Sequence, residues 1–152
     1  MDSARSGVAI RSASDADADA LASLSTQLGY PCGAAAMRTR LERVRERNAG
    51  AVFVAEDSQS RVVGWAHAVE RFHLEDEPFV ELAGLVVDES VRSTGIGAAL
   101  LRAVESWARE QGHDRLRVRS NVVRERAHRF YAREGYAERK RQVVFDKPLT
   151  KF

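Results

Sequence analysis

The chain has 152 residues, of which 44% are hydrophobic and 30% are charged, a composition typical of one soluble globular domain with a single buried core. Its only cysteine, Cys32, excludes an internal disulfide, and no apolar run approaches the roughly 20 residues of a membrane span, so we expect no membrane association, no secretion signal and a cytoplasmic location. The net charge of +2 conceals an uneven distribution: residues 1–90 carry 15 acidic and 9 basic side chains, whereas residues 91–152 carry 7 acidic and 15 basic ones. The acidic part suits a cationic ligand and the basic part suits phosphates.

The first part of the chain predicts one strand and two helices. Residues 8–11 are typical of a strand, and Ser14 with Asp15 can cap a helix whose apolar spacing continues to Gly29. Residues 34–48 form the second predicted helix, with apolar side chains on one side and arginines elsewhere.

Three strands are predicted next. Residues 51–56 and 62–69 are strand-like and are separated by turn residues, which indicates an antiparallel hairpin. An acidic loop at 75–77 then precedes residues 79–87. This third strand is nearly all apolar, so we expect it in the interior of the sheet.

The last part predicts two helices and two short strands. Residues 96–111 give the clearest helix, because a broad apolar stripe runs along it until Gly112. Residues 116–119 alternate as a strand, 125–134 form the last helix, and 143–145 predict a final strand. The order of the elements indicates a mixed α/β domain.

A loop suited to phosphate joins the strand at 79–87 to the helix at 96–111, and it reads Arg92-Ser93-Thr94-Gly95-Ile96-Gly97. Glycine lets the backbone turn tightly and approach a ligand, and the first N–H groups of a helix lie at the positive end of its dipole without partners inside the helix. This arrangement binds phosphate, and the arginine adds a fixed positive charge. A Walker-type loop and a dinucleotide fingerprint are excluded, because the Gly-Lys-Ser/Thr ending and a third glycine are missing.

At every specified position the loop matches Gln/Arg-x-x-Gly-x-Gly/Ala, the pyrophosphate signature of the GNAT superfamily of acetyl-CoA-dependent N-acetyltransferases. Downstream, residues 121–136 resemble the Asn…Ala…Phe-Tyr…Gly-Phe/Tyr segment of that family. The resemblance covers roughly residues 8–149. It implies one domain over residues 1–152 with the α/β GNAT fold, a mixed and mostly antiparallel sheet flanked by helices, with the fourth and fifth strands splayed apart.

The resemblance also implies acetyl-CoA as cosubstrate, with no metal. Backbone groups of the fourth strand would hold the pantetheine arm, and the glycine loop would hold the pyrophosphate. Several of these residues have a plainer alternative: strand residues in the core, a turn asparagine, and arginines that only solvate a helix. The expected cofactor-binding residues are Leu85, Val86, Val87, Arg92, Ser93, Thr94, Gly95, Ile96, Gly97, Ala98, Asn121, Arg126, Arg129 and Tyr131.

Two residues are candidates for the catalytic proton transfers. Glu81 is a carboxylate in an otherwise apolar strand, eleven residues before Arg92, a spacing at which some GNAT enzymes place a general base. Burial would raise the pKa of such a carboxyl group, although a strand glutamate paired with an arginine is an equal alternative. Tyr131 occupies the position of the family's proton donor to the coenzyme A thiolate, and its alternative is a core tyrosine.

The predicted function is transfer of acetyl from acetyl-CoA to a primary amine of a small, cationic acceptor, such as an aminoglycoside or a polyamine. The acceptor cavity is expected between the first two helices, the loop at 75–77 and Glu81. A peptide or protein amine acetyltransferase and a non-catalytic acyl-CoA sensor are alternatives. Nucleic-acid binding is not expected, because no aromatic platform accompanies the arginines. Many relatives pair, so the resemblance allows a homodimer.

Overall fold

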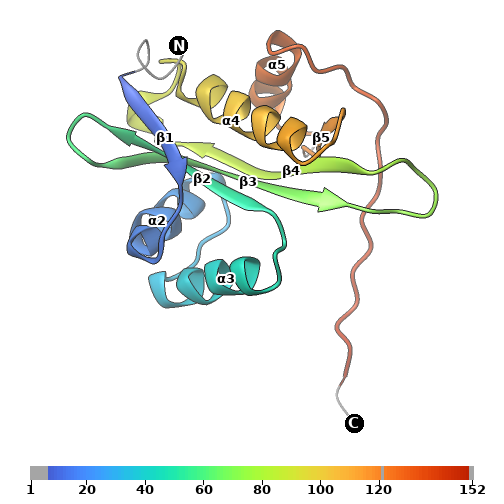
Figure 1. Cartoon of the computed structure of the whole chain (residues 1–152), viewed down its shortest axis with the longest axis horizontal. Coiled ribbons are helices and arrows are strands. Elements are labelled where there is room, and N and C mark those ends of the chain that lie inside the picture. Colours follow the sequence, from blue (N-terminus) through green and yellow to red (C-terminus); the bar gives the residue numbers. More distant parts are fainter. Residues whose placement is uncertain (1–6, 121, 151–152) are drawn as a thin grey trace. The chain divides into compact units, whose positions relative to one another are not determined.

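The computed structural model describes residues 7–120 and 122–150, which fall into two compact units, Met1–Arg119 and Ser120–Phe152. The first unit contains a five-stranded sheet in the order β1-β2-β3-β4-β5 (Figure 1). The first four strands are antiparallel neighbours and β5 joins β4 in parallel, so the predicted mixed, mostly antiparallel sheet is confirmed. The strands are β1 (Val8–Ser12), β2 (Ala51–Asp57), β3 (Val62–Arg71), β4 (Phe79–Val87) and β5 (Leu116–Val118).

Helices cover both faces of this sheet. Helix α4 (Ile96–Glu110) lies on one face, and α2 (Ala18–Leu28) and α3 (Ala34–Glu46) lie on the other (Figure 1). Two short 3-10 helices, η1 (Asp15–Asp17) and η2 (Glu89–Val91), precede α2 and α4. Within the described ranges, no helix has the length and apolarity needed to cross a membrane.

Alternation along β3 shows which side chains face which helices. A Cβ added at Gly64 would lie 3.0 Å from Cδ1 of Leu100, so this residue faces α4. The next residue, Trp65, packs instead against a cluster that contains Leu21 of α2 and Leu41 of α3. We therefore call the side of the sheet that carries Trp65, His67, Val69 and Arg71 the α2 face.

The start of the first helical segment is fixed by Ser14, which the sequence predicts as a cap, together with Asp17. The N–H of Ser14 donates to Oδ2 of Asp17 over 2.8 Å, as in a capping box. Asp17 also accepts two hydrogen bonds from the Arg11 guanidinium, at 2.8 and 2.9 Å, and these bonds hold the pKa of its carboxyl group below the ordinary value. Gly29 ends α2 in the left-handed region, at φ 100°.

Helix α4 buries the apolar stripe that its sequence predicts. Its buried hydrophobic residues recur at helical spacing, so one side of the helix packs onto the sheet. They are Ile96, Ala99, Leu100, Leu101, Val104 and Ala108. This packing fixes where the first turn of α4, and the loop before it, stand relative to the end of β4.

The second unit contains α5 (Glu125–Arg133), in which Phe130 and Tyr131 make an edge-to-face contact with centroids 5.1 Å apart. The predicted final strand at 143–145 is wrong, because residues 134–150 form no helix or strand. Val143, Val144 and Phe145 are 76%, 86% and 90% exposed. Apolar residues become a strand only where a neighbouring strand supplies backbone partners, and no described residue pairs with this segment.

Candidate active site

Strand β4 changes the direction of its backbone groups along its length. The N–H of Val80 donates to the carbonyl of Arg115, at 3.1 Å, and so faces β5. The N–H of Asp88 donates to the carbonyl of Val63, at 2.8 Å, and so faces β3. Residues eight positions apart on a regular strand face the same side, because the side-chain period is two. One extra residue must therefore lie between them.

That extra residue is Ala83, in a β-bulge. His67 of β3 pairs with Gly84, and the next β3 residue, Ala68, pairs with Leu82, so Ala83 has no partner in the ladder. A bulge of this kind shifts the alternation of the strand by one residue. After it, odd-numbered residues of β4 turn their N–H and C=O groups away from β3.

The backbone groups that this shift turns away from β3 belong to Leu85 and Val87. Strand β5 pairs with β4 only at Val80–Leu82, so it ends before it reaches these two residues and the two strands are splayed as expected. Val86 alternates in the opposite sense, since its backbone pairs with Trp65 of β3. Leu85 and Val87 thus present a row of backbone donors and acceptors that an extended ligand can bind, whereas the backbone of Val86 is used inside the sheet.

The loop after β4 contains two residues in the left-handed backbone region. These are Ser93 at φ 67° and Gly95 at φ 88°, and Gly95 is the N-cap of α4. Between them, the Thr94 hydroxyl donates to the carbonyl of Val91 over 2.6 Å, which holds the turn. Gly97 is helical, so of the two glycines only Gly95 requires the left-handed conformation.

The first turn of α4 leaves backbone amides available. The N–H of Ala99 donates to the carbonyl of Gly95 over 3.0 Å and makes the first bond of the helical ladder. The amides of Ile96, Gly97 and Ala98 precede that bond, at the positive end of the helix dipole. With Arg92 exposed next to them, these groups can bind an anion such as a diphosphate.

Glu81 lies on the α2 face and is buried, with 6% of its surface exposed. Nη2 of Arg71 donates to its Oε2 over 3.0 Å. Nε of Arg119 forms an ion pair with Oε1 at 3.1 Å, although Oε1 makes no well-formed hydrogen bond within the described residues. The carboxylate is therefore held by two guanidinium groups and still has one oxygen with unused hydrogen-bonding capacity.

Two guanidinium groups face the single carboxylate of Glu81. The side chains of Arg71 and Arg119 are 42% and 56% exposed, so both keep donors that a ligand can reach. Asp76 of the acidic loop does not offset them, because it binds Arg117 at 2.8 Å and Arg115 at 3.4 Å. The hydrogen bond from Arg117 lowers the pKa of Asp76 to about 2, so its charge is already balanced.

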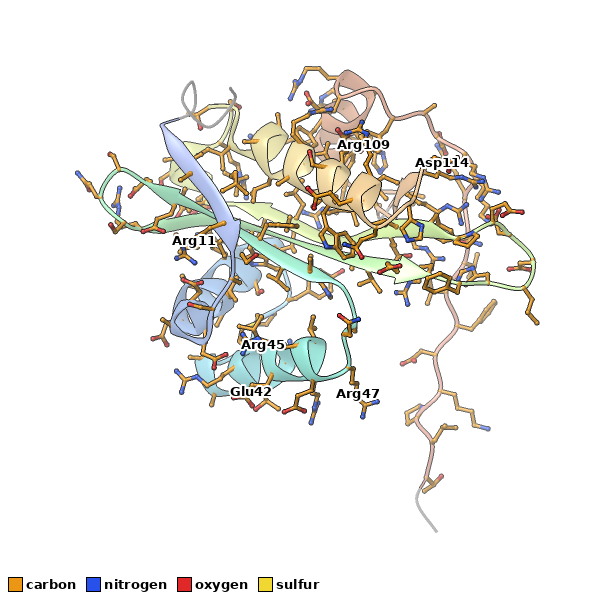
Figure 2. All side chains as sticks on the ribbon, in the orientation of Figure 1. Arg11, Glu42, Arg45, Arg47, Arg109 and Asp114 are labelled. Atoms are coloured by element: carbon orange, nitrogen blue, oxygen red, sulfur yellow. The ribbon has the colours of Figure 1, made fainter. Side chains whose placement is uncertain are left out.

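The exposed side of α3 is more basic than acidic. Figure 2 shows Glu42 and Arg45 on this helix and Arg47 just after it, and all three are exposed. Arg45 is paired with Asp15 at 3.0 Å. The charged residues of this segment are Arg38, Arg40, Glu42, Arg43, Arg45, Glu46 and Arg47. The acidic character of residues 1–90 is therefore not carried by α3.

The remaining predicted site residues belong to the second unit. Arg126 and Arg129 are exposed on α5, and Asn121 lies outside the described residues. Tyr131 contacts Phe130 and, with centroids 6.0 Å apart, Tyr136. Burial raises the pKa of Tyr131 to about 12, against a smaller opposite effect from Arg124, so its phenol is protonated at neutral pH.

Two polar residues of the α2 face, Trp65 and His67, were not among the site residues predicted from the sequence. Nε1 of Trp65 and Nε2 of His67 are buried without a hydrogen-bond partner among the described residues. The sequence holds a signal for them, since both alternate with the small residues Gly64, Ala66 and Ala68, which pack under α4. A histidine opposite such a small, buried row points to the other face of the sheet.

The chain matches the model of the acetyltransferase (GNAT) family over residues 18–136. It is 34% identical over 144 residues to an aminoglycoside N(6')-acetyltransferase type 1 of Stenotrophomonas maltophilia, a match that covers 92% of this chain and 93% of that one. It is also 38% identical over 78 residues to an aminoalkylphosphonate N-acetyltransferase of Salmonella typhimurium, covering 51% of each.

Solved structures agree in fold. An aminoglycoside antibiotic 6'-N-acetyltransferase of Acinetobacter baumannii superposes with a TM-score of 0.82 at 19% identity, covering 95% of this chain and 100% of that one. A second aminoglycoside N-acetyltransferase, solved in complex with CoA, gives a TM-score of 0.82 at 21% identity, with 92% and 94% covered. At these identities the likeness concerns the fold.

Proposed function

The chain belongs to the acetyltransferase (GNAT) family and is an acetyltransferase, and from this premise we propose that it moves acetyl from acetyl-CoA to the primary amine of a small acceptor by direct transfer. The observation that carries the proposal is the backbone edge of Leu85 and Val87. This edge opens where β5 ends, one short loop before the free amides of α4. A ligand with an extended amide-bearing arm and a diphosphate matches both features.

The proposed cofactor contacts follow from this geometry. Leu85 and Val87 bind the pantetheine arm through their backbone, and the amides of residues 94–98 bind the diphosphate with help from Arg92. Arg126, Arg129 and Asn121 are assigned to the cofactor by family resemblance alone. We also propose that one acetyltransferase domain spans residues 1–152, because the family match at 18–136 runs across the boundary between the two units.

The proposed chemistry assigns one proton transfer to each candidate residue. An alkyl ammonium, with a pKa near ~10, must lose a proton before its nitrogen can attack the thioester carbonyl. Glu81 takes that proton, directly or through water, at its Oε1 atom. As the carbon–nitrogen bond forms and the carbon–sulfur bond breaks, the Tyr131 phenol, assigned by family resemblance, gives its proton to the departing thiolate. The nitrogen loses its second proton as the amide forms, and that proton returns through water to the Tyr131 phenolate.

The identity of the acceptor has two candidates. An aminoglycoside is supported by the Stenotrophomonas relative, which covers nearly the whole chain. An amine that also carries an acidic group is supported by a different observation: Arg71 and Arg119 outnumber Glu81 and keep donors exposed. The Salmonella relative, named for aminoalkylphosphonates, fits this second class. Guanidinium groups bind phosphonate and carboxylate in pairs of hydrogen bonds.

Thiol release from acetyl-CoA tests the proposal. The acceptors are kanamycin A, spermidine, aminoethylphosphonate and a lysine-containing peptide, and each reaction is run beside a blank without amine. Release above the blank with the small amines is expected. Release with the peptide alone would favour the protein-modifying alternative. Tight binding of acetyl-CoA without release by any amine would contradict the proposal and favour a sensor.

A further inference from the structure

Unsatisfied polar atoms are concentrated in one part of the molecule. Five buried side-chain nitrogen or oxygen atoms lack a hydrogen-bond partner in the part of the chain that the structure describes. Four of them lie on neighbouring strands of the first unit: Trp65 Nε1, His67 Nε2, Glu81 Oε1 and Arg117 Nε. Buried polar atoms in folded proteins are nearly always paired, because an unpaired one costs free energy. A cluster of exceptions therefore marks a place that water or a polar ligand can occupy.

The pairing of the strands puts these atoms on the same face. Trp65 and His67 are two positions apart on β3, and Val69, the next residue on that side, is paired directly with Glu81. In the register of the parallel β4–β5 ladder, Glu81 lies beside Arg117 of β5. All four side chains thus lie on the α2 face, next to the bulge that turns Leu85 toward the splayed edge.

His67 has the most specific chemistry of the four. The backbone of Ala49 hydrogen-bonds its imidazole, and Nε2 is the nitrogen left without a partner, so we assign the proton to Nδ1. Burial lowers the pKa of His67, and Arg71 lowers it further. The hydrogen bond to Ala49 and the charge of Glu81 oppose this, but the net shift is downward, which keeps the ring neutral at neutral pH. A neutral ring with Nδ1 protonated has a lone pair on Nε2. It can therefore accept one hydrogen bond and can donate none there.

We propose that His67 binds the acceptor substrate, with its Nε2 atom accepting a hydrogen bond from the amine that is to be acetylated. This inference rests on the proposed function, and it adds a substrate-binding residue to it. An ammonium or amino group has several N–H donors, so it can bind His67 and Glu81 together. Glu81 is already held by two arginines, whereas Nε2 of His67 has its full acceptor capacity left. His67 fixes the direction of the amine and leaves the proton transfer to Glu81.

Paired substitutions at position 67 test the inference. His67→Leu removes the acceptor atom and leaves an apolar side chain in a buried place. His67→Gln keeps a polar group that can accept a hydrogen bond at about the same distance from the backbone. With kanamycin A or aminoethylphosphonate as acceptor, we expect His67→Leu to raise the KM for the amine roughly 10- to 100-fold, the range for a hydrogen bond to a charged group. The KM for acetyl-CoA should stay within about 2-fold, since that ligand uses other groups.

His67→Gln should recover most of the affinity for the amine. Equal losses in both variants, or equal changes in the KM for acetyl-CoA, would indicate a structural role and overturn the inference. Thermal unfolding supplies a control for folding. His67→Leu leaves the Ala49 backbone group without its partner, so its Tm should fall somewhat, and KM is compared at a temperature well below the Tm of both variants.

A second readout does not depend on turnover. In unmodified protein labelled with nitrogen-15 histidine, the Nε2 signal of His67, identified by its loss in His67→Gln, should shift when kanamycin A or aminoethylphosphonate is added. A signal that neither amine moves contradicts the binding role, whether or not thiol is released. Absence of thiol release in the acceptor panel, with the Nε2 shift present, would instead count against the proposed reaction alone.

Discussion

The six-membered ring of Trp65 occupies the space that a side chain would need at Gly84. A Cβ built on Gly84 would lie 2.7 Å from Cζ3 and 2.8 Å from Cη2 of Trp65, closer than such atoms approach in proteins. Gly84 directly follows the bulged residue of β4, so the ring packs against the point where the strand changes alternation. The indole ring therefore packs directly beside the bulge, in space that the absence of a side chain at Gly84 leaves open.

Gly84→Ala should destabilise the protein by about 1–3 kcal/mol, the usual cost of overpacking a well-filled site. Denaturant unfolding measures this change. The matched control is Trp65→Phe, whose smaller ring leaves room for a methyl group. In the double variant the loss of stability caused by Gly84→Ala should be much smaller than in the wild-type background. If the free-energy changes of the two substitutions simply add, the contact between Gly84 and Trp65 is not the cause of the loss.

Proline substitutions on neighbouring residues separate the two sides of β4. Leu85→Pro removes an N–H that faces the splayed edge, so CoA affinity should fall roughly 2- to 10-fold, as for loss of one neutral hydrogen bond. Val86→Pro removes an N–H inside the β3–β4 ladder, so stability should fall far more. Calorimetric titration with CoA and thermal unfolding measure the two effects. A Leu85→Pro protein that binds CoA normally would remove this edge from the binding site.

Glu81→Gln keeps the shape of the side chain and removes its charge. We expect a lower rate at neutral pH and a changed pH–rate profile, because a proton acceptor has been lost. Some loss of stability accompanies it, limited by the exposure of Arg71 and Arg119, which water can solvate. Arg119→Gln is the control, since it disturbs the same ion pair and keeps the carboxylate. If Glu81→Gln and Arg119→Gln have the same pH–rate profile, Glu81 has a structural role and is not the proton acceptor.

Tyr131→Phe tests the proton donor. Turnover should fall by roughly 10²-fold, the lower range for general acid catalysis, with CoA affinity unchanged. Because folding raises the pKa of Tyr131 from 10.0 to about 12, the neutral phenol stabilises the folded state, and that contribution is complete below pH 10.0 and is lost as the pH rises through about 12. An absorbance titration should lose one late-titrating tyrosine in the variant. If the titration step that is missing from the variant lies near pH 10 instead, Tyr131 does not have the raised pKa of a buried phenol.

Local patterns were sufficient for most elements of the fold. The apolar stripe of α4 and the alternation of β2 and β3 depend on neighbouring residues, so the sequence predicts them within about two residues. The final strand at 143–145 was wrong because a strand depends on a distant partner edge, and composition cannot supply it. A strand pattern there describes only the preference of the residues.

The site was predictable where chemistry is local to the chain. Gly95 stands in the left-handed region before a helix, as its loop indicates. The pairing of Glu81 with Arg71 and Arg119 was not predictable in detail, because it depends on the register of three strands. The open Nε2 of His67 depends on the same register and on Ala49, far away in the sequence. Long-range pairing, which single residues do not encode, decides both.

Amide NMR of the labelled protein during titration with CoA tests the proposed cofactor site most directly. The largest shifts are expected at the amides of Leu85 and Val87 and of residues 94–98, with Val86 changing less because its N–H stays in the ladder. Saturable binding of CoA that leaves these amides unmoved, and shifts another group of residues instead, would contradict the placement of the cofactor on this edge and loop.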